Sequence, residues 1–223
     1  MRSLDKRRGV WLPGSSAYTA APAPEGPIDI AVLASGSGSN LQALLETPAV
    51  RPHIALVISD RSGARALERA IEHGVQTETV LWSDHDGRDA FSTAVADAVE
   101  ASGAKGVVLA GFMRILGPTF VARFPDRILN IHPSLLPAFP GPHAVEAALD
   151  HGVTVSGVTV HIVDEGVDSG PIVAQVPVEV DPDDTAESLH TRIQREEHRI
   201  YPEVVTAFVE GRIEVVDRRV VVR

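Results

Sequence analysis

The chain has 223 residues, of which 44% are hydrophobic and 22% charged, the composition of an ordinary globular domain. It contains no cysteine, which excludes disulfides, thiolate metal ligands and cysteine nucleophiles. The net charge is −10 without a long basic run, and no apolar stretch approaches the roughly 18 residues of a membrane span. We therefore expect a cytoplasmic protein with neither a nucleic-acid nor a membrane partner.

The first 27 residues differ from the rest of the chain. They are rich in Ala, Pro, Gly and Ser and show no hydrophobic period. The positive charges at their start are not followed by the long apolar segment of a secretory signal. We expect residues 1–27 to form a flexible tail and residues 28–223 to form one domain.

Apolar runs and helical patterns alternate from residue 28 onwards. Apolar segments typical of buried parallel strands cover 28–35, 53–60, 106–113 and 127–132, and residues 75–82 also look like a strand. Patterns with apolar residues three and four apart predict helices between them, over 40–46, 64–74 and 87–103. This alternation predicts a parallel sheet with helices on both faces.

The pattern changes after Gly141. A short helix is expected over 143–152, followed by two antiparallel strands within 154–180 that flank an acidic loop. A long helix over 183–212 has Asp184 and Glu187 spaced as a capping box, and Pro202 should kink it. An edge strand is expected over 213–222. The predicted fold is therefore an α/β, Rossmann-like open sheet, with a parallel N-terminal half and a mixed, antiparallel C-terminal extension.

Small residues fill the segment "SGSGSN", residues 35–40, between the first predicted strand and helix. Such a loop lets backbone N–H groups approach an anion, most simply a phosphate. A dinucleotide site would use Gly36 and Gly38 as its first two glycines and Asp60 as the ribose-binding acid, but Leu41 occupies the third glycine position. A turn without a ligand is the third interpretation.

Asn130 and His132 lie two residues apart at the end of a predicted strand, so their side chains should share one side. Ligands bind at this end of an open α/β sheet, and the four prolines between residues 133 and 142 would restrict the following loop. Taken alone, the pair also fits a histidine that has only a structural role.

Three carboxylates, Asp164, Glu165 and Asp168, crowd the segment "DEGVDSG". Close carboxylates perturb one another's pKa, as in acid–base sites, although a solvated acidic turn explains the segment equally simply. A metal site that includes His161 is a further alternative, but no familiar metal-ligand spacing is present.

Five segments then occur in order: "SGSGSNLQALL", "VVLAGFMRIL", "NIHPSLLPAFPG", "GVTVHIVDEGVDSGPI" and "EEHRIYP". Together they resemble the glycinamide ribonucleotide formyltransferases, a folate-dependent family of purine synthesis. The similarity covers almost all of residues 28–215. It implies transfer of the formyl group of 10-formyltetrahydrofolate to the amine of glycinamide ribonucleotide, in de novo IMP synthesis. The folate is then a co-substrate, and a homodimer is one alternative for the assembly.

The resemblance also assigns site residues. The catalytic residues would be Asn130, His132 and Asp168. The residues that bind glycinamide ribonucleotide would be Gly38, Ser39, Asn40, Gln194, Arg195, Glu196 and Glu197. The residues that bind the formyl-folate would be Arg88, Met113, Arg114, Ile115, Leu116, Asn130, Val163, Asp164, Glu165, Gly166, Val167 and Asp168.

The implied chemistry is attack of an amine on a formamide-like carbonyl, with a tetrahedral oxyanion. Asn130 and His132 would donate N–H groups to that oxygen. Asp168 would orient His132, favour its charged form and pass a proton through water from the attacking amine to the leaving nitrogen. This chemistry needs no metal and no covalent nucleophile.

Other functions use related domains. A formyltetrahydrofolate hydrolase shares the Asn, His and Asp but lets water replace the amine, and it carries a regulatory domain in front. Methionyl-tRNA formyltransferase carries a further RNA-binding domain. An NAD-dependent oxidoreductase and a catalytically silent nucleotide-binding module are alternatives from other classes; Leu41 disfavours the first, and the three catalytic positions disfavour the second.

Overall fold

The computed structural model describes residues 3–5, 10–12 and 26–223. Its main sheet has seven strands in the order β5-β4-β3-β6-β7-β8-β9. Their bounds are β3 Ile30–Leu33, β4 Ile54–Ser59, β5 Thr77–Thr79, β6 Gly106–Leu109, β7 Ile128–His132, β8 Val155–Ile162 and β9 Ile172–Glu179. The pairs from β5 to β7 are parallel, and β8 and β9 pair antiparallel. Both halves of the predicted sheet are confirmed.

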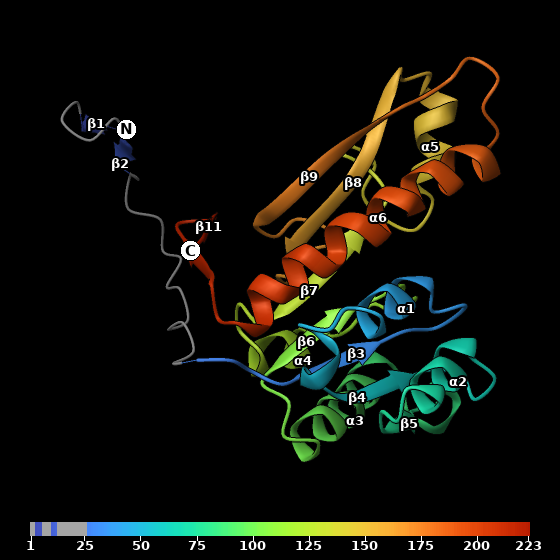
Figure 1. Cartoon of the computed structure of the whole chain (residues 1–223), viewed down its shortest axis with the longest axis vertical. Helices are drawn as coiled ribbons and strands as arrows, with labels where there is room; N and C mark the ends of the chain where they lie inside the picture. The colour runs from blue at the N-terminus through green and yellow to red at the C-terminus, as the bar shows by residue number, and fades with distance from the viewer. Residues whose placement is uncertain (1–2, 6–9, 13–25) are drawn as a thin grey trace.

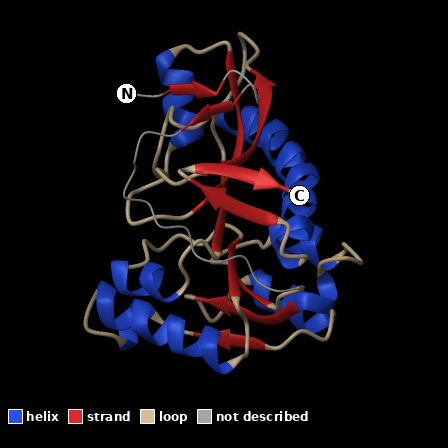
Figure 2. Ribbon diagram, turned by 90° about the vertical axis from the view of Figure 1, so that its left-hand side faces the viewer, coloured by secondary structure: helices blue, strands red, loops and turns tan. Residues whose placement is uncertain are grey.

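Six helices cover the two faces of this sheet (Figures 1 and 2). They are α1 Ser39–Leu45, α2 Arg65–Glu72, α3 Arg88–Ala101, α4 Pro118–Arg123, α5 Ala144–His151 and α6 Ala186–Val209. Side chains alternate along each strand. In β3, Ile30 and Val32 therefore pack in the core under α1, α2, α5 and α6, whereas Ala31 and Leu33 pack in the core under α3 and α4. The predicted layers, with helices on both faces, are confirmed.

Helix α6 runs along β7, β8 and β9 and joins them to the parallel half of the sheet (Figure 1). Its N-cap is Thr185, whose hydroxyl accepts from the N–H of Ser188 in a capping box. The predicted box of Asp184 and Glu187 was therefore wrong by one residue. Asp184 instead accepts a hydrogen bond from the Ser188 hydroxyl and pairs with Arg192. Pro202 lies within the helix without ending it.

Residues 213–222 were predicted to form an edge strand, but they do not join the main sheet. They form a separate antiparallel pair, β10 Ile213–Val216 and β11 Arg219–Val222, which ends at the C-terminus (Figure 2). Asp217 and Arg218 both have positive φ, at 48° and 63°, and make the turn between the strands. The reversal at "VVDRRV" thus replaces one long strand by a hairpin.

The predicted tail falls mainly outside the described residues. Within it, β1 Ser3–Asp5 and β2 Val10–Leu12 pair antiparallel. In the described part of the chain, no helix is long and apolar enough to cross a membrane.

Candidate active site

The carboxyl end of β7 carries Asn130 and His132, and the antiparallel neighbour β8 faces them. The register pairs Asn130 with His161 and His132 with Thr159. Because side chains of paired residues project to the same face, this register brings a second histidine beside Asn130. The ring of His132 is almost fully buried, and so is that of His161.

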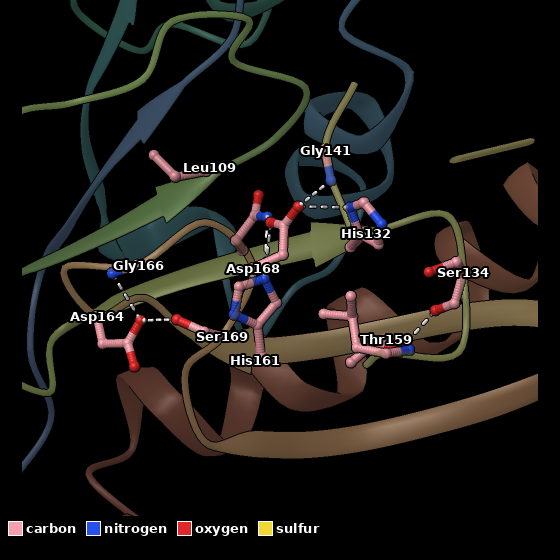
Figure 3. Close-up of polar contacts among 12 residues, drawn as sticks. Leu109, His132, Ser134, Gly141, Thr159, His161, Asp164, Gly166, Asp168 and Ser169 are labelled. Carbon is pink, nitrogen blue, oxygen red and sulfur yellow. Dashed lines mark hydrogen bonds and ion pairs between the residues drawn. The ribbon is translucent and has the colours of Figure 1, made fainter. Parts of the chain in front are cut away.

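Asp168 reaches this pair from the loop between β8 and β9 (Figure 3). Its Oδ2 lies 3.4 Å from His132 Nδ1, and its Oδ1 lies 3.5 Å from His161 Nε2. The backbone N–H of Gly141 donates to Oδ2 at 2.8 Å. One carboxylate is therefore shared by two histidines and one backbone amide. The three predicted catalytic residues therefore meet at one point, although Asp168 is 38 residues from Asn130 in the sequence.

The carboxyl group of Asp168 has a perturbed pKa. Burial alone would raise this pKa, but hydrogen bonds from His161 and Gly141 and the charges of His132 and His161 together lower it to about 2. Asp168 is therefore ionised at neutral pH and supplies a fixed negative charge beside His132.

Each polar group in the cluster has identifiable partners. His132 Nε2 donates to the carbonyl of Phe139 at 2.8 Å, and its Nδ1 lies 3.4 Å from Asp168 Oδ2, so both ring nitrogens face acceptor oxygens. Asn130 Nδ2 lies 3.1 Å from His161 Nε2 and 3.5 Å from Asp168 Oδ1. The 3.5 Å contact is at the limit of a hydrogen bond, so a substrate oxygen can replace it at little cost.

The proline-rich loop after β7 is fixed by hydrogen bonds to β8 and β9. Thr159 Oγ1 donates to the carbonyl of Ser134 at 2.7 Å and accepts from the N–H of Leu136 at 3.0 Å. Gln175 of β9 donates to the carbonyl of Leu136 at 2.9 Å. These bonds hold Phe139 and Gly141, which contact His132 and Asp168, in a defined position.

Sequence reasoning considered His161 only as a metal ligand and missed its place in this cluster. Its Nδ1 donates to the carbonyl of Ile162 at 3.1 Å, which leaves Nε2 directed at Asn130 and Asp168. Only the register between β7 and β8 could have revealed this contact, because 31 residues separate His161 from Asn130. Among the described residues, no group of three or more side chains is arranged to hold a metal ion.

A second cluster joins α1 to α6. Asn40 Nδ2 donates to Glu197 Oε2 at 2.9 Å, and Gln194 Nε2 donates to Ser39 Oγ at 2.9 Å. Burial raises the pKa of Glu197, although the bond from Asn40 and the charges of His190 and His132 oppose this shift. These residues were predicted to bind glycinamide ribonucleotide, and the structure brings four of them together across the sequence.

The neighbouring residues on α6 face elsewhere. Arg195 is exposed, and Glu196 pairs with Arg199 at 2.8 Å. On a helix, residues 194 and 197 share a face, whereas 195 and 196 turn away from it. A ligand role for Arg195 and Glu196 stays a prediction.

The loop before α1 has a shape that requires glycine. Gly38 has φ of 68°, and a Cβ atom there would lie 2.7 Å from the Cα of Ala66. Arg69 of α2 braces the loop, since its Nε donates to the carbonyl of Ser37 at 2.9 Å. A cavity of 490 Å³ opens beside Ser39, and its wall includes the cationic side chains Arg69 and Arg199.

The dinucleotide interpretation does not fit this region. Leu41 is fully buried in the core, where the third glycine of that motif would stand. The carboxylate of Asp60 accepts from Arg114 Nε at 2.9 Å and is itself fully buried, so it does not face a ribose site.

The segment after β6 presents apolar side chains to solvent. Met113 and Ile115 are 64% and 61% exposed, an unusual state for large apolar residues in a well-anchored loop. The N–H of Met113 donates to Ser35 Oγ and the N–H of Gly117 donates to Ser92 Oγ, both at 2.8 Å. Arg88 lies beside this segment, because a Cβ atom on Gly117 would be 3.7 Å from its Nε. Met113–Leu116 thus form a fixed apolar surface with a cation at its edge.

The acidic loop closes the site on the side of β8. Asp164 Oδ1 accepts from the N–H of Gly166 at 3.1 Å and from Ser169 Oγ at 2.6 Å. Arg218 of the C-terminal hairpin lies 3.4 Å from Asp164 Oδ2. Glu165, Gly166 and Val167 are exposed at the tip. The loop is therefore held at its base while its tip faces solvent.

Known proteins share both the sequence and the fold. The family model for formyl transferase matches residues 28–205. Phosphoribosylglycinamide formyltransferase of Mycobacterium tuberculosis H37Rv is 48% identical over 198 residues, which cover 87% of this chain and 91% of that protein. The protein of the same name from Escherichia coli K12 is 41% identical over 189 residues, which cover 83% and 89% of the two chains.

A solved structure, glycinamide ribonucleotide transformylase 1 from Symbiobacterium toebii, is 48% identical and superposes with a TM-score of 0.85, over 89% of this chain and 95% of that one. The family match begins at the first residue of the folded core and includes the cluster around Asp168 and the junction of α1 and α6. This chain therefore belongs to the formyl transferase family.

Proposed function

We propose that Asn130, His132 and Asp168 catalyse, in this chain, the reaction of the phosphoribosylglycinamide formyltransferases. The observation that carries this assignment is the convergence of His132, His161 and Asn130 on the one carboxylate of Asp168. Relatives with this activity match almost the full length of the chain at 41% and 48% identity. The chain transfers a formyl group to the amine of glycinamide ribonucleotide, a step of purine biosynthesis.

Asn130 and His132 would donate N–H groups to the formyl oxygen as its charge develops. For this, His132 would exchange its contact with the Phe139 carbonyl or with Asp168 for the formyl oxygen. The amide nitrogen of Asn130 is already oriented by His161, and only its weak 3.5 Å contact with Asp168 has to be given up. Donors fixed before the reaction lose little on reorganisation, and removing one such donor typically costs about 3 kcal/mol of transition-state stabilisation.

Asp168 would orient His132 and place a negative charge beside its ring. Its ionised carboxylate, with a pKa of about 2, stands 3.4 Å from His132 Nδ1. It would also receive, through water, the proton that the attacking amine loses and return it to the leaving nitrogen. The backbone N–H of Gly141 donates to Oδ2 and so holds the carboxylate in one orientation.

The glycinamide ribonucleotide would bind between α1 and α6. The loop Gly38–Asn40 would bind its phosphate, since backbone can approach an anion closely there and Arg69 and Arg199 lie beside it. Asn40, Gln194 and Glu197 already form one hydrogen-bonded junction with Ser39, and its polar atoms would bind the ribose. Asn40 Oδ1 is buried and accepts no hydrogen bond within the described residues, so it is available to a ligand hydroxyl.

The formyl donor would be 10-formyltetrahydrofolate, bound between Met113–Leu116 and the acidic loop. The exposed apolar side chains of Met113 and Ile115 fit the flat apolar surface of a pterin. Arg88 at the edge of that surface would pair with a carboxylate of the folate. When bound, this co-substrate supplies the activated formyl group, and the chain supplies orientation and charge.

The same site could in principle let water replace the amine, as in a formyltetrahydrofolate hydrolase. The relatives do not favour this alternative. Both are named formyltransferases, and the match covers 91% and 89% of their lengths. A direct assay with 10-formyltetrahydrofolate tests both activities. We expect tetrahydrofolate to form only when glycinamide ribonucleotide is present and the rate to survive a chelator, in accord with a cytoplasmic enzyme that needs no metal. Release of formate without the ribonucleotide would overturn the assignment.

A further inference from the structure

Asp60, at the carboxyl end of β4, has an environment that the proposed reaction does not explain. Its side chain is fully buried, yet only one of its oxygens is well bonded. Oδ2 accepts from Arg114 Nε at 2.9 Å and lies 4.0 Å from Nε of the exposed Arg61, while Oδ1 has no hydrogen-bond partner within the described residues. A buried carboxylate with one strong hydrogen bond and one long ion pair is costly, because the desolvation penalty can exceed the Coulombic gain. Stability alone does not account for an acid at this position.

The partner of Asp60 links it to the proposed folate surface. Arg114 lies in the middle of Met113–Leu116, and its guanidinium carbon stands 5.0 Å from the centre of the Trp82 ring. Trp82 in turn packs against Phe91 of α3, with ring centres 5.2 Å apart. The guanidinium is thus held on one side by a carboxylate and on the other by an aromatic face, a cation–π arrangement.

The backbone around Arg114 is bonded at both ends, by Ser35 at Met113 and by Ser92 at Gly117. Those bonds fix where the segment begins and ends but not how its middle turns. The contact of Arg114 with Asp60 and Trp82 fixes the middle. When the Arg114 side chain turns inward to Asp60, its neighbours Met113 and Ile115 turn outward, as their exposure shows.

We propose that Asp60 is a positioning residue for the folate surface: by holding Arg114 against Trp82, its buried carboxylate keeps Met113 and Ile115 directed outward, ready to receive a pterin. This inference rests on the proposed placement of the folate. It adds that Asp60 touches no substrate but influences the affinity for the formyl donor. The affinity for glycinamide ribonucleotide does not depend on it.

Steady-state kinetics of Asp60→Ala test the proposal. We expect the KM for 10-formyltetrahydrofolate to rise about threefold to tenfold, the cost of ordering one or two side chains on binding. The KM for glycinamide ribonucleotide and kcat at saturation should stay within about twofold, because the α1–α6 junction and the Asp168 cluster are separate from this contact. Glu78→Gln, an exposed acid on the neighbouring strand β5, is the matched control and should change none of these constants.

A double variant shows whether Asp60 acts through Arg114. Once Arg114→Ala has removed the contact, adding Asp60→Ala should raise the folate KM by less than about twofold more, because coupled residues are not additive. Full additivity would overturn the proposal. Asp60→Asn keeps the shape and one acceptor oxygen; it should fold with an unchanged Tm and show a smaller rise in the folate KM. It provides the test if Asp60→Ala does not fold.

Fluorescence gives a readout that does not depend on activity. The chain has two tryptophans, so Trp11→Phe leaves Trp82 as the sole emitter. In that background Asp60→Ala should make Trp82 more accessible to acrylamide, because Arg114 no longer covers the ring. Unchanged quenching together with an unchanged folate KM would overturn the proposal.

One more variant separates this inference from the placement on which it rests. Ile115→Ser removes an exposed apolar contact without touching Asp60. If it raises the folate KM while Asp60→Ala does not, Asp60 is not a positioning residue and the folate placement stands. If neither variant affects that KM, the folate placement is wrong and this inference fails with it.

Discussion

At the scale of single residues, Asp168 is the side chain that contacts Asn130, His132 and His161 alike. Asp168→Asn keeps the shape of the side chain and removes its charge. The protonated form of His132 then loses its nearest anion, and the proton path loses its carboxylate. We expect kcat to fall by at least about a hundredfold, the lower range for a positioned acid–base group. Both KM values should stay within a few-fold, because the substrates would contact mainly other residues.

The measurement is turnover of the folded variant at saturating substrates across roughly pH 5 to 9, the range around neutrality in which general acid–base catalysts act. Asp150→Asn on the exposed face of α5 makes the same chemical change away from the site and should behave as the parent. Turnover of Asp168→Asn within a few-fold of the parent, with an unchanged pH profile, would show that the carboxylate has no catalytic role.

The lowered pKa of Asp168 also predicts a pH-dependent stability. The pKa of about 2 in the folded state lies below the unfolded value of about 3.9. The group therefore stabilises the fold fully above about pH 4, and this contribution is lost as the pH falls towards 2. Asp168→Asn should lower the free energy of unfolding by up to about 2 kcal/mol at pH 7, and by progressively less as the pH falls below 4. Denaturant unfolding of both proteins at pH 7 and pH 3 measures the difference; an equal difference at both values would contradict it.

The sequence could predict two of the residues that meet at Asp168, Asn130 and His132, but not the third, His161. Asn130 and His132 were expected on one side because strand geometry fixes alternation, and they lie so. His161 was missed because its neighbour across the sheet depends on the β7–β8 register, which no local pattern encodes. Likewise, the pairing of Asn40 with Glu197, 157 residues away, becomes visible only when α6 is packed on α1.

At the scale of elements, the junction of α1 and α6 carries a buried acid. Burial raises the pKa of Glu197, so the folded state is disfavoured as the pH rises through and above the ordinary range of a glutamate. Glu197→Gln removes the charge and should leave the free energy of unfolding at pH 8 unchanged or higher. It should raise the KM for glycinamide ribonucleotide at least about tenfold, the typical effect of losing a hydrogen bond to a charged group.

Thermal unfolding and initial-rate kinetics test this pair of effects. Glu187→Gln, an exposed acid at the start of the same helix, is the control; it should change the free energy of unfolding by less than about 0.5 kcal/mol and leave the ribonucleotide KM unchanged. A variant that is less stable at pH 8, with normal ribonucleotide affinity, would make Glu197 a structural residue.

The loop between β3 and α1 gives a second prediction for an element. Gly38→Ala adds a Cβ atom 2.7 Å from the Cα of Ala66 at a residue with positive φ, so the loop must shift away from α2. The KM for glycinamide ribonucleotide should rise at least about tenfold, with the folate KM nearly unchanged. Gly36→Ala is the matched control, because nothing lies within 4 Å of its Cβ position. Equal loss of both substrates in a folded Gly38→Ala protein would refute the phosphate placement.

Elements were predictable where a local pattern suffices and not where the neighbours decide. The buried strands β3, β4, β6 and β7 are visible in the sequence as apolar runs, and their positions were predicted correctly. The run over 75–82 gave only the short edge strand β5, Thr77–Thr79, since two of its three side chains are exposed and little packing extends it. The end of the chain reads as one strand, yet two consecutive residues with positive φ at Asp217 and Arg218 reverse it. Both segments lie outside the centre of the main sheet, where tertiary contacts influence strand formation more than the intrinsic β-propensity of the residues does.

At the scale of the whole molecule, the site lies where the sheet changes from parallel to antiparallel. The parallel half supplies the loops of β3 and β6, which are proposed to bind phosphate and folate. The antiparallel half supplies His161 and the loop of Asp168, and β7 at the junction supplies Asn130 and His132. Helix α6 connects the halves, because Tyr201 donates to the carbonyl of Leu109 in β6 at 2.8 Å while the helix also packs on β8 and β9. The proposed reaction geometry thus depends on both halves of the domain.

This arrangement predicts that residues 26–223 contain the whole activity. The family match starts at residue 28, and the core begins with Ile28, which is 6% exposed and donates its N–H to the carbonyl of Val209 at 2.7 Å.

A chain lacking residues 1–25 should keep the parent Tm and a kcat within about twofold, since it loses no described contact of the site. A chain lacking residues 1–29 should be less stable, because it also loses Ile28 and the Asp29 carbonyl that accepts from Lys105 and Gly106. Thermal unfolding and the transfer assay on the three proteins decide the boundary. A fall in kcat of more than about tenfold on removal of residues 1–25, with the Tm unchanged, would mean that those residues contribute to catalysis, and the domain boundary would have to move to include them.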